Sequence, residues 1–187
     1  MINWKTGFGN FSLGMQGMNM FKTMEYTWGH RFIQKMPMDT YGFSPSADLG
    51  IGYANNFGLI KMSALVTNGS GYKRVETDKN KKISLHVLYG QSKLNKNKGF
   101  NCGGSFSLEP YDVDESKTDN INVMSLFTGF SGFGFRGGLE YDIKKQSNVK
   151  SKIISFYGTY ALSDKISFLA RLDEVGGDTS KSGYGVQ

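Results

Sequence analysis

The chain has 187 residues and a formal net charge of +6 at pH 7, with 25 glycines, 3 prolines and 14% aromatic residues. A chain of this length usually forms one domain, and no stretch approaches the roughly 18 consecutive apolar residues of a membrane-spanning helix, which excludes helical membrane proteins. The positive charge predicts an affinity for anions, and because no nucleic-acid-binding module is recognisable, nucleic acid is not expected as a partner.

The first part of the chain is predicted to contain one complete strand and a long connection. The sequence Gly-Phe-Gly-Asn at 7–10 is typical of a tight turn, so residues 2–6 would end an earlier strand and 10–16 would form the next. Residues 16–45 form a connection with six methionines in it or at its edge. Connections of this length usually have a function or are disordered, and methionine suits packing against irregular surfaces. Two interpretations stay open: a loop folded into the lumen of a barrel, which would narrow the pore, and a loop packed on the barrel rim.

Further strands are predicted beyond this connection, each with alternating apolar and polar side chains. The clearest is 133–143, where Phe135 and Tyr141 fall on one face and Glu140 on the other. The least clear is 121–130, where both faces carry apolar groups. The predicted strands are 46–54, 59–67, 82–90, 100–109, 121–130, 133–143, 151–162 and 166–174.

The connections between these strands broadly alternate in length. Short turns are predicted at 55–58, 130–133 and 163–165, long polar loops at 68–80 and 110–120, and a polar loop of intermediate length at 144–150. Outer-membrane barrels combine short periplasmic turns, longer outer loops and strands of about nine to eleven residues. The pattern therefore predicts an all-β fold: an antiparallel up-and-down transmembrane β-barrel, with its apolar face toward lipid and its polar face toward a watery lumen.

The strand count predicts that the barrel is incomplete. We expect about 9–10 strands, a start partway along a strand and an end in a polar, glycine-rich loop, whereas single-chain bacterial barrels have even numbers of strands. The N-terminal sequence Met-Ile-Asn-Trp-Lys lacks the features of a signal peptide. Residues 1–187 are therefore interpreted as a single partial barrel domain, a fragment of a larger one.

Three short segments resemble the middle of a Gram-negative porin, in the group of the phosphate-selective porins O and P. They are Trp-Gly-His-Arg-Phe-Ile at 28–33, Ser-Ala-Asp-Leu-Gly-Ile at 46–51 and Ala-Leu-Val-Thr-Asn-Gly-Ser-Gly-Tyr at 64–72. The resemblance implies a porin of roughly 16 strands, usually a trimer, with an inward-folded loop at the constriction. It also implies passive diffusion of small hydrophilic, often anionic solutes, with phosphate as one option.

Charged residues on the polar face and in the long connection are candidates for lining the pore or its constriction. Fixed positive charge in a lumen lowers the energy of a passing anion. The alternative is a mixed-charge lining that only keeps the pore hydrated, because acidic neighbours cancel much of the field. The candidates are Arg31, Lys35, Asp48, Lys61, Arg136, Glu140 and Arg171.

No chemistry beyond transport is predicted. His30 and His86 lie in different segments without Cys or carboxylates at ligand spacing, so no metal and no cofactor are expected. No nucleophile and base form a recognisable motif, so the chain is predicted not to be an enzyme.

The expected location is the bacterial outer membrane, and the expected partners are its lipid and lipopolysaccharide, small hydrophilic solutes and further copies in a homotrimer. Two other interpretations share the same alternating pattern. One is a soluble lipocalin-like barrel that binds a ligand inside, with its apolar face inward. The other is a small closed outer-membrane barrel with a structural or adhesive role.

Overall fold

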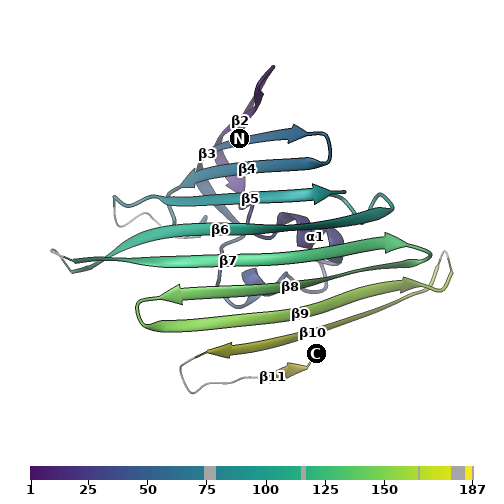
Figure 1. Ribbon diagram of the computed structural model, residues 1–187. Helices are drawn as coiled ribbons and strands as arrows, with labels where there is room; N and C mark the ends of the chain where they lie inside the picture. The colour runs from purple at the N-terminus through teal and green to yellow at the C-terminus, as the bar shows by residue number, and fades with distance from the viewer. Residues whose placement is uncertain (74–78, 115–116, 164, 178–183, 187) are drawn as a thin grey trace.

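The computed structural model describes residues 1–73, 79–114, 117–163, 165–177 and 184–186. Within these residues, eleven antiparallel strands follow one another in chain order in a single curved sheet (Figure 1). No helix in the described part is long and apolar enough to cross a membrane. The strands are β1 (Ile2–Thr6), β2 (Gly9–Gly17), β3 (Ala47–Phe57), β4 (Ile60–Thr67), β5 (Lys82–Gly90), β6 (Gly99–Asp114), β7 (Lys117–Gly132), β8 (Phe135–Gln146), β9 (Val149–Ala161), β10 (Ser167–Gly177) and β11 (Tyr184–Val186).

The two faces of the sheet differ in the way that the alternation predicts. Along β5, Ile83 and Leu85 are each 47% exposed, whereas Ser84 between them is completely buried. We call the face with the exposed apolar side chains the outer face and the opposite, polar face the inner face. The lipocalin-like interpretation is wrong, because it requires the apolar side chains to point inward.

Residues 18–46, here called the inner segment, lie against the inner face (Figure 1). They contain α1 (Lys22–Trp28) and α2 (Pro37–Thr40), of which α1 contacts β7, β8 and β9. Gly29 ends α1 in the left-handed conformation, and Pro37 opens α2 at the position where a missing backbone N–H costs least.

The buried apolar core lies between the inner segment and the sheet. The segment contributes side chains that are almost completely buried, and the strands contribute five apolar residues that point inward. This explains the mixed pattern of the 121–130 sequence, since Val123 and Phe127 interrupt the polar face to meet the segment. The core residues are Met20, Phe21, Met24, Trp28, Met36, Met38 and Phe43 from the segment and Leu88, Val123, Phe127, Ile153 and Tyr157 from the strands.

The structure corrects three of the predicted connections. The prediction of a polar loop at 110–120 is wrong, because β6 and β7 continue through most of these residues as a long paired hairpin. Residues 115–116 lie outside the described part of the chain. The loop at 144–150 is a two-residue turn, and the glycine-rich tail includes β11. Polar residues on both faces give no hydrophobic periodicity, so the sequence did not reveal these strand extensions.

The sheet has two edges. In the described residues β1 pairs with β2 alone and β11 with β10 alone, so the eleven strands form an open, partial barrel. The interpretation as a small closed barrel is therefore not supported. The prediction of 9–10 strands did not include β11.

Candidate functional site

Cationic side chains on the inner face of the sheet bind the inner segment through its backbone carbonyl groups. Arg136 of β8 donates to the carbonyl of Trp28 at 3.1 Å, and Lys144 of the same strand donates to that of Gly42 at 2.9 Å. Arg171 of β10 donates to the carbonyl of Lys35. These bonds come from two strands and reach well-separated points, so they fix the position of the segment across the inner face.

Arg171 is itself held rigidly. Its Nε donates to Oδ1 of Asp173 at 2.9 Å and its Nη2 to Oδ2 at 2.7 Å, and both side chains are nearly completely buried. Ser155 donates a further hydrogen bond to Asp173 at 2.6 Å. A two-point contact of this kind fixes the guanidinium plane, so its remaining N–H group is directed at the inner segment.

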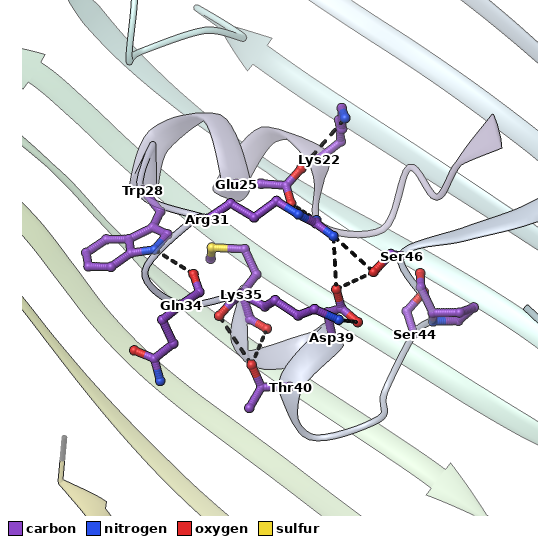
Figure 2. A network of polar contacts seen from close by, with 12 residues as sticks. Lys22, Glu25, Trp28, Arg31, Gln34, Lys35, Asp39, Thr40, Ser44 and Ser46 are labelled. Atoms are coloured by element: carbon purple, nitrogen blue, oxygen red, sulfur yellow. Dashed lines mark hydrogen bonds and ion pairs between the residues drawn. The ribbon is translucent and has the colours of Figure 1, made fainter. Parts of the chain in front are cut away.

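A second polar network connects the two helices of the segment (Figure 2). Arg31 donates to Glu25 and, at 3.1 Å, to Ser46, and lies 3.6 Å from Asp39. Lys35 lies 3.4 Å from Asp39. The side chains of Glu25 and Asp39 are 10% and 8% exposed, whereas those of Arg31 and Lys35 are 42% and 45% exposed. The cationic groups therefore face the open space and the carboxylates lie behind them.

The hydrogen bond from Arg31 to Glu25 raises the pKa of Arg31 above its ordinary value, with further support from the charges of Glu25 and Asp39. The guanidinium therefore keeps its charge throughout the pH range in which proteins fold. It supplies a permanent positive group on the exposed surface of the segment.

His30 lies where the inner segment contacts the inner face of the sheet. Its Nε2 is 2.9 Å from Oγ1 of Thr159 and 3.2 Å from Nη2 of Arg136, and its ring packs edge-on against Trp28. Burial lowers the pKa of His30, and the charge of Arg136 lowers it further. The imidazole is therefore neutral at pH 7, and its Nε2 can accept a hydrogen bond from Arg136.

Two carboxylates of β8 lie buried under the segment without a hydrogen-bond partner. Glu140 and Asp142 are both completely buried, and none of their four carboxylate oxygens has a partner among the described residues. In the same part of the chain the hydroxyl of Tyr157 also has no hydrogen-bond partner. Within the described part of the chain, no group of three or more His, Cys, Asp or Glu side chains could hold a metal ion.

A cavity of about 430 Å³ opens between the inner segment and the strand ends that carry the long loops. Lys82 donates to Glu109 at 2.9 Å in its wall, and Lys144 reaches the segment from the same wall. Among the described residues, two carboxylates therefore face four ammonium groups. The charged lining residues are Lys35, Lys73, Lys82, Lys144, Asp39 and Glu109.

The structure brings only some of the predicted pore-lining residues together. Arg136 and Arg171 hold the segment, whereas Glu140 is covered by it and meets no open lumen. Asp48 accepts backbone N–H bonds from residues 49 and 69 at 2.8 and 2.6 Å, which fixes the chain where it leaves β4. Lys61 lies apart, 3.0 Å from the hydroxyl of Ser92.

Sequence reasoning missed the lysines at the cavity mouth. Lys82 and Lys144 stand at strand ends, where the alternating pattern stops, and Lys73 belongs to the long polar loop predicted at 68–80. The sequence does show an excess of lysine next to the long loops. That excess could have indicated a positively charged opening at this end of the barrel.

No family model and no curated protein matches the chain. Two similar solved structures are both of outer-membrane proteins of Vibrio cholerae. Outer-membrane expressed OmpT shares 16% sequence identity at a TM-score of 0.64, with 96% of this chain and 59% of that chain covered. A loop L8 deletion mutant of OmpT shares 16% at a TM-score of 0.62, with 92% and 60% covered. The chain therefore spans about 60% of the length of these structures.

The class of protein follows from fold and surface together. The chain has the all-β, up-and-down fold of outer-membrane β-barrels, as part of a larger barrel. A broad apolar outer face on such a fold is stable only in contact with lipid, so the chain is located in the bacterial outer membrane. The comparisons give no support to membership of the phosphate-selective porin group. The predicted resemblance to that group is therefore replaced by the broader class of outer-membrane β-barrels.

The prediction that the chain is not an enzyme is also corrected. It depended on the absence of a recognisable catalytic motif, and the similarity to the OmpT structures contradicts that exclusion. At 16% identity the likeness shows the fold alone, and one fold can carry catalytic groups as well as channels. A missing motif is therefore no reason to rule out enzymatic activity.

Proposed function

We propose that the chain forms part of the wall of a water-filled channel through which small hydrophilic solutes diffuse passively. This proposal rests on the difference in polarity between the two faces of the sheet. Apolar side chains occupy the outer face, and Ser, Thr, Asn and charged side chains occupy the inner one. A barrel with a polar interior holds water, and solutes cross it without a carrier step.

The inner segment would narrow this channel. It lies across the inner face, is held at three backbone carbonyls by Arg136, Lys144 and Arg171, and turns Arg31 and Lys35 toward open space. Solutes would pass beside it.

We propose that the channel favours anions. Among the described residues, lysines outnumber carboxylates around the cavity at the long-loop end, and the exposed groups of the inner segment are cationic. Fixed positive charge at a narrow point raises the local concentration of anions and lowers that of cations. Nothing in this arrangement selects phosphate over other small anions.

The partners follow from the same proposal. The outer face would contact lipid, and the basic loops would contact lipopolysaccharide phosphates. A homotrimer stays a prediction, and the native mass of the full-length protein in detergent would test it.

Planar bilayers containing the full-length protein test the channel directly. We expect stepwise conductance in KCl. Under a salt gradient, the reversal potential should have the sign that indicates selectivity for anions. Replacing Lys35 and Lys73 by Gln should shift that potential toward zero. The matched control is Lys96→Gln, which removes the same charge from an exposed turn at the other end of the barrel. Absence of conductance would refute the channel, and cation selectivity would refute the anion preference.

A further inference from the structure

Three lysines of β8 and β9 point outward at the end of the sheet that carries the long loops. Lys145 shares its face of β8 with Ile143, and Lys150 and Lys152 share theirs on β9 with Phe156, which is 54% exposed on the outer face. All three lysines are exposed. We call Lys145, Lys150 and Lys152 the lysine patch. It is continuous with the lipid-facing surface and separate from the cavity at the long-loop end.

The strand register brings the three side chains of the patch close together. Lys145 stands directly opposite Lys150, and Cβ atoms of residues paired in this way are about 5 Å apart. Lys152 follows Lys150 at two positions along β9, about 7 Å away on the same face. Like charges directly opposite each other destabilise a pair of strands. An anionic partner at the patch would offset that cost.

The surrounding sheet does not neutralise the patch. Among the described residues, no member of the patch forms an ion pair. Glu174 of β10 shares the outer face but stands opposite Ile154 in the register. Lys152 stands opposite Gly176, where an added Cβ atom would lie 3.1 Å from its Cε. The stem of Lys152 therefore lies along the surface of the sheet, in the space that the glycine leaves.

The patch lies at the height where the apolar band of a barrel ends. Lys145 is ten residues beyond Phe135 on β8, and ten strand residues rise about 34 Å along the strand. At a strand tilt of about 40° this is about 26 Å along the membrane normal, and the apolar band of outer-membrane barrels is about 25 Å tall. At the short-turn rim, the outward positions of the same strands and of β10 carry the aromatic residues Phe135, Tyr160 and Phe168. Lysine therefore takes the place of aromatic rings at the long-loop rim.

We propose that the lysine patch binds the phosphate groups on the lipid anchor of lipopolysaccharide. The long loops of an outer-membrane barrel face the cell exterior, so the patch lies among the headgroups of the outer leaflet. An ammonium group binds phosphate through charge-assisted hydrogen bonds, while the lysine stems keep contact with apolar surface. The inference extends the lipopolysaccharide contact of the proposed function from the loops to the strands. It depends on the orientation of the barrel in the membrane and not on conduction.

Native mass spectrometry of the full-length protein in detergent measures its binding of lipid A, the lipid anchor of lipopolysaccharide. Lipid A with its phosphates should bind more tightly than dephosphorylated lipid A or phosphatidylglycerol. Each lysine beside an anionic lipid contributes a factor of about five, so replacing all three patch lysines by Gln should weaken binding by about a hundredfold. Replacing the same three by Arg keeps the charge and should preserve binding.

The matched control changes three exposed lysines at the short-turn end. Replacing Lys93, Lys96 and Lys98 by Gln removes the same net charge from the connection between β5 and β6. These residues lie at the opposite rim, so the affinity for lipid A should not change.

Three results would overturn this inference. The first is an unchanged affinity when the patch lysines are replaced by Gln, and the second is an equal loss in the control, which would attribute binding to net charge alone. The third is equal binding of lipid A without phosphates or of phosphatidylglycerol. Bilayer recordings keep the two proposals apart. Phosphate-dependent binding at the patch in a protein without conductance would support the patch and overturn the channel, and the reverse result would leave the channel in place.

Discussion

Glu140 is an acidic side chain that the inner face buries completely, with neither oxygen bonded within the described residues. Burying a carboxylate without a partner costs free energy, and an apolar group of similar length avoids that cost. Glu140→Met should therefore raise the free energy of unfolding in detergent, by about 1–3 kcal/mol. Denaturant titration of the full-length protein measures the change.

The control for this variant is a second carboxylate-to-methionine change, at the half-buried Glu109, with the opposite expectation. Glu109 accepts from Lys82 at 2.9 Å, and the Lys82 side chain is only 2% exposed. Glu109→Met leaves that ammonium buried and unpaired, so it should destabilise the protein. A loss of stability in Glu140→Met as large as in Glu109→Met would contradict our view of the two sites.

His30 predicts a pH dependence in the attachment of the inner segment. Its pKa is lowered when the segment is in place, so the detached segment binds the proton more readily. The stabilisation by His30 is complete above its ordinary pKa of 6.5 and is lost progressively as the pH falls below that value. The protection factors of residues 18–46, which correct hydrogen exchange for its slower intrinsic rate in acid, should therefore be lower at pH 5.5 than at pH 7.5.

Other groups also titrate in acid, so the informative quantity is the difference from a variant. His30→Gln keeps a polar group that can face Thr159 and Arg136 but does not titrate. The loss of protection at low pH should be smaller in His30→Gln. An identical pH dependence in both proteins would refute a role for His30.

At the scale of elements, the attachment of the inner segment depends on Gly29 at the end of α1. The residue has a φ of +74°, and a Cβ atom there would lie 2.7 Å from Nη2 of Arg136. Since that nitrogen donates to the carbonyl of Trp28, moving it aside breaks one of the three anchors. Gly29→Ala should loosen the segment and raise the single-channel conductance.

Gly42 provides a matched control for this change. It has a φ of +70°, close to that of Gly29, but an added Cβ would have no atom within 4 Å. Gly42→Ala thus carries the same backbone strain without the collision. If both variants increase proteolysis of the segment equally, backbone strain alone accounts for the effect and the anchor at Arg136 is unimportant.

The strands were predictable from the sequence, but the placement of the segment was not. A strand with one apolar face shows a period of two, which 133–143 displays clearly. The helices α1 and α2 have seven and four residues, too short for a helical period to stand out. Val123 and Phe127 on the polar face of β7 were the local sign of a covering layer, and their cause appears only when the chain is folded.

The candidate site was predictable in part for the same reason. Arg136 and Arg171 were found because they lie on the polar face of regular strands. The carbonyls to which they donate, those of Trp28 and Lys35, lie more than a hundred residues away in the chain. Such contacts leave no local pattern in the sequence.

At the scale of the whole molecule, the outer face should tolerate charge only near its rims. Leu126 is 54% exposed along β7, whereas Phe133 is 93% exposed in the turn to β8. Leu126→Lys should cost about 2–4 kcal/mol of folding free energy in lipid, and Phe133→Lys about 0–1 kcal/mol. Unfolding in lipid vesicles measures both, and equal costs would contradict a lipid-facing outer surface.

The central claim is the orientation of the two faces, and nitroxide labels along β5 test it most directly. Labels would be placed singly at residues 83–88, with Cys102 replaced by Ser, in the full-length protein reconstituted in bilayers. Collisions with lipid-soluble oxygen should be frequent at Ile83, Leu85 and Val87 and rare at Ser84 and His86, in a period of two. The opposite phase, with oxygen reaching the even positions and a water-soluble nickel reagent the odd ones, would contradict the account.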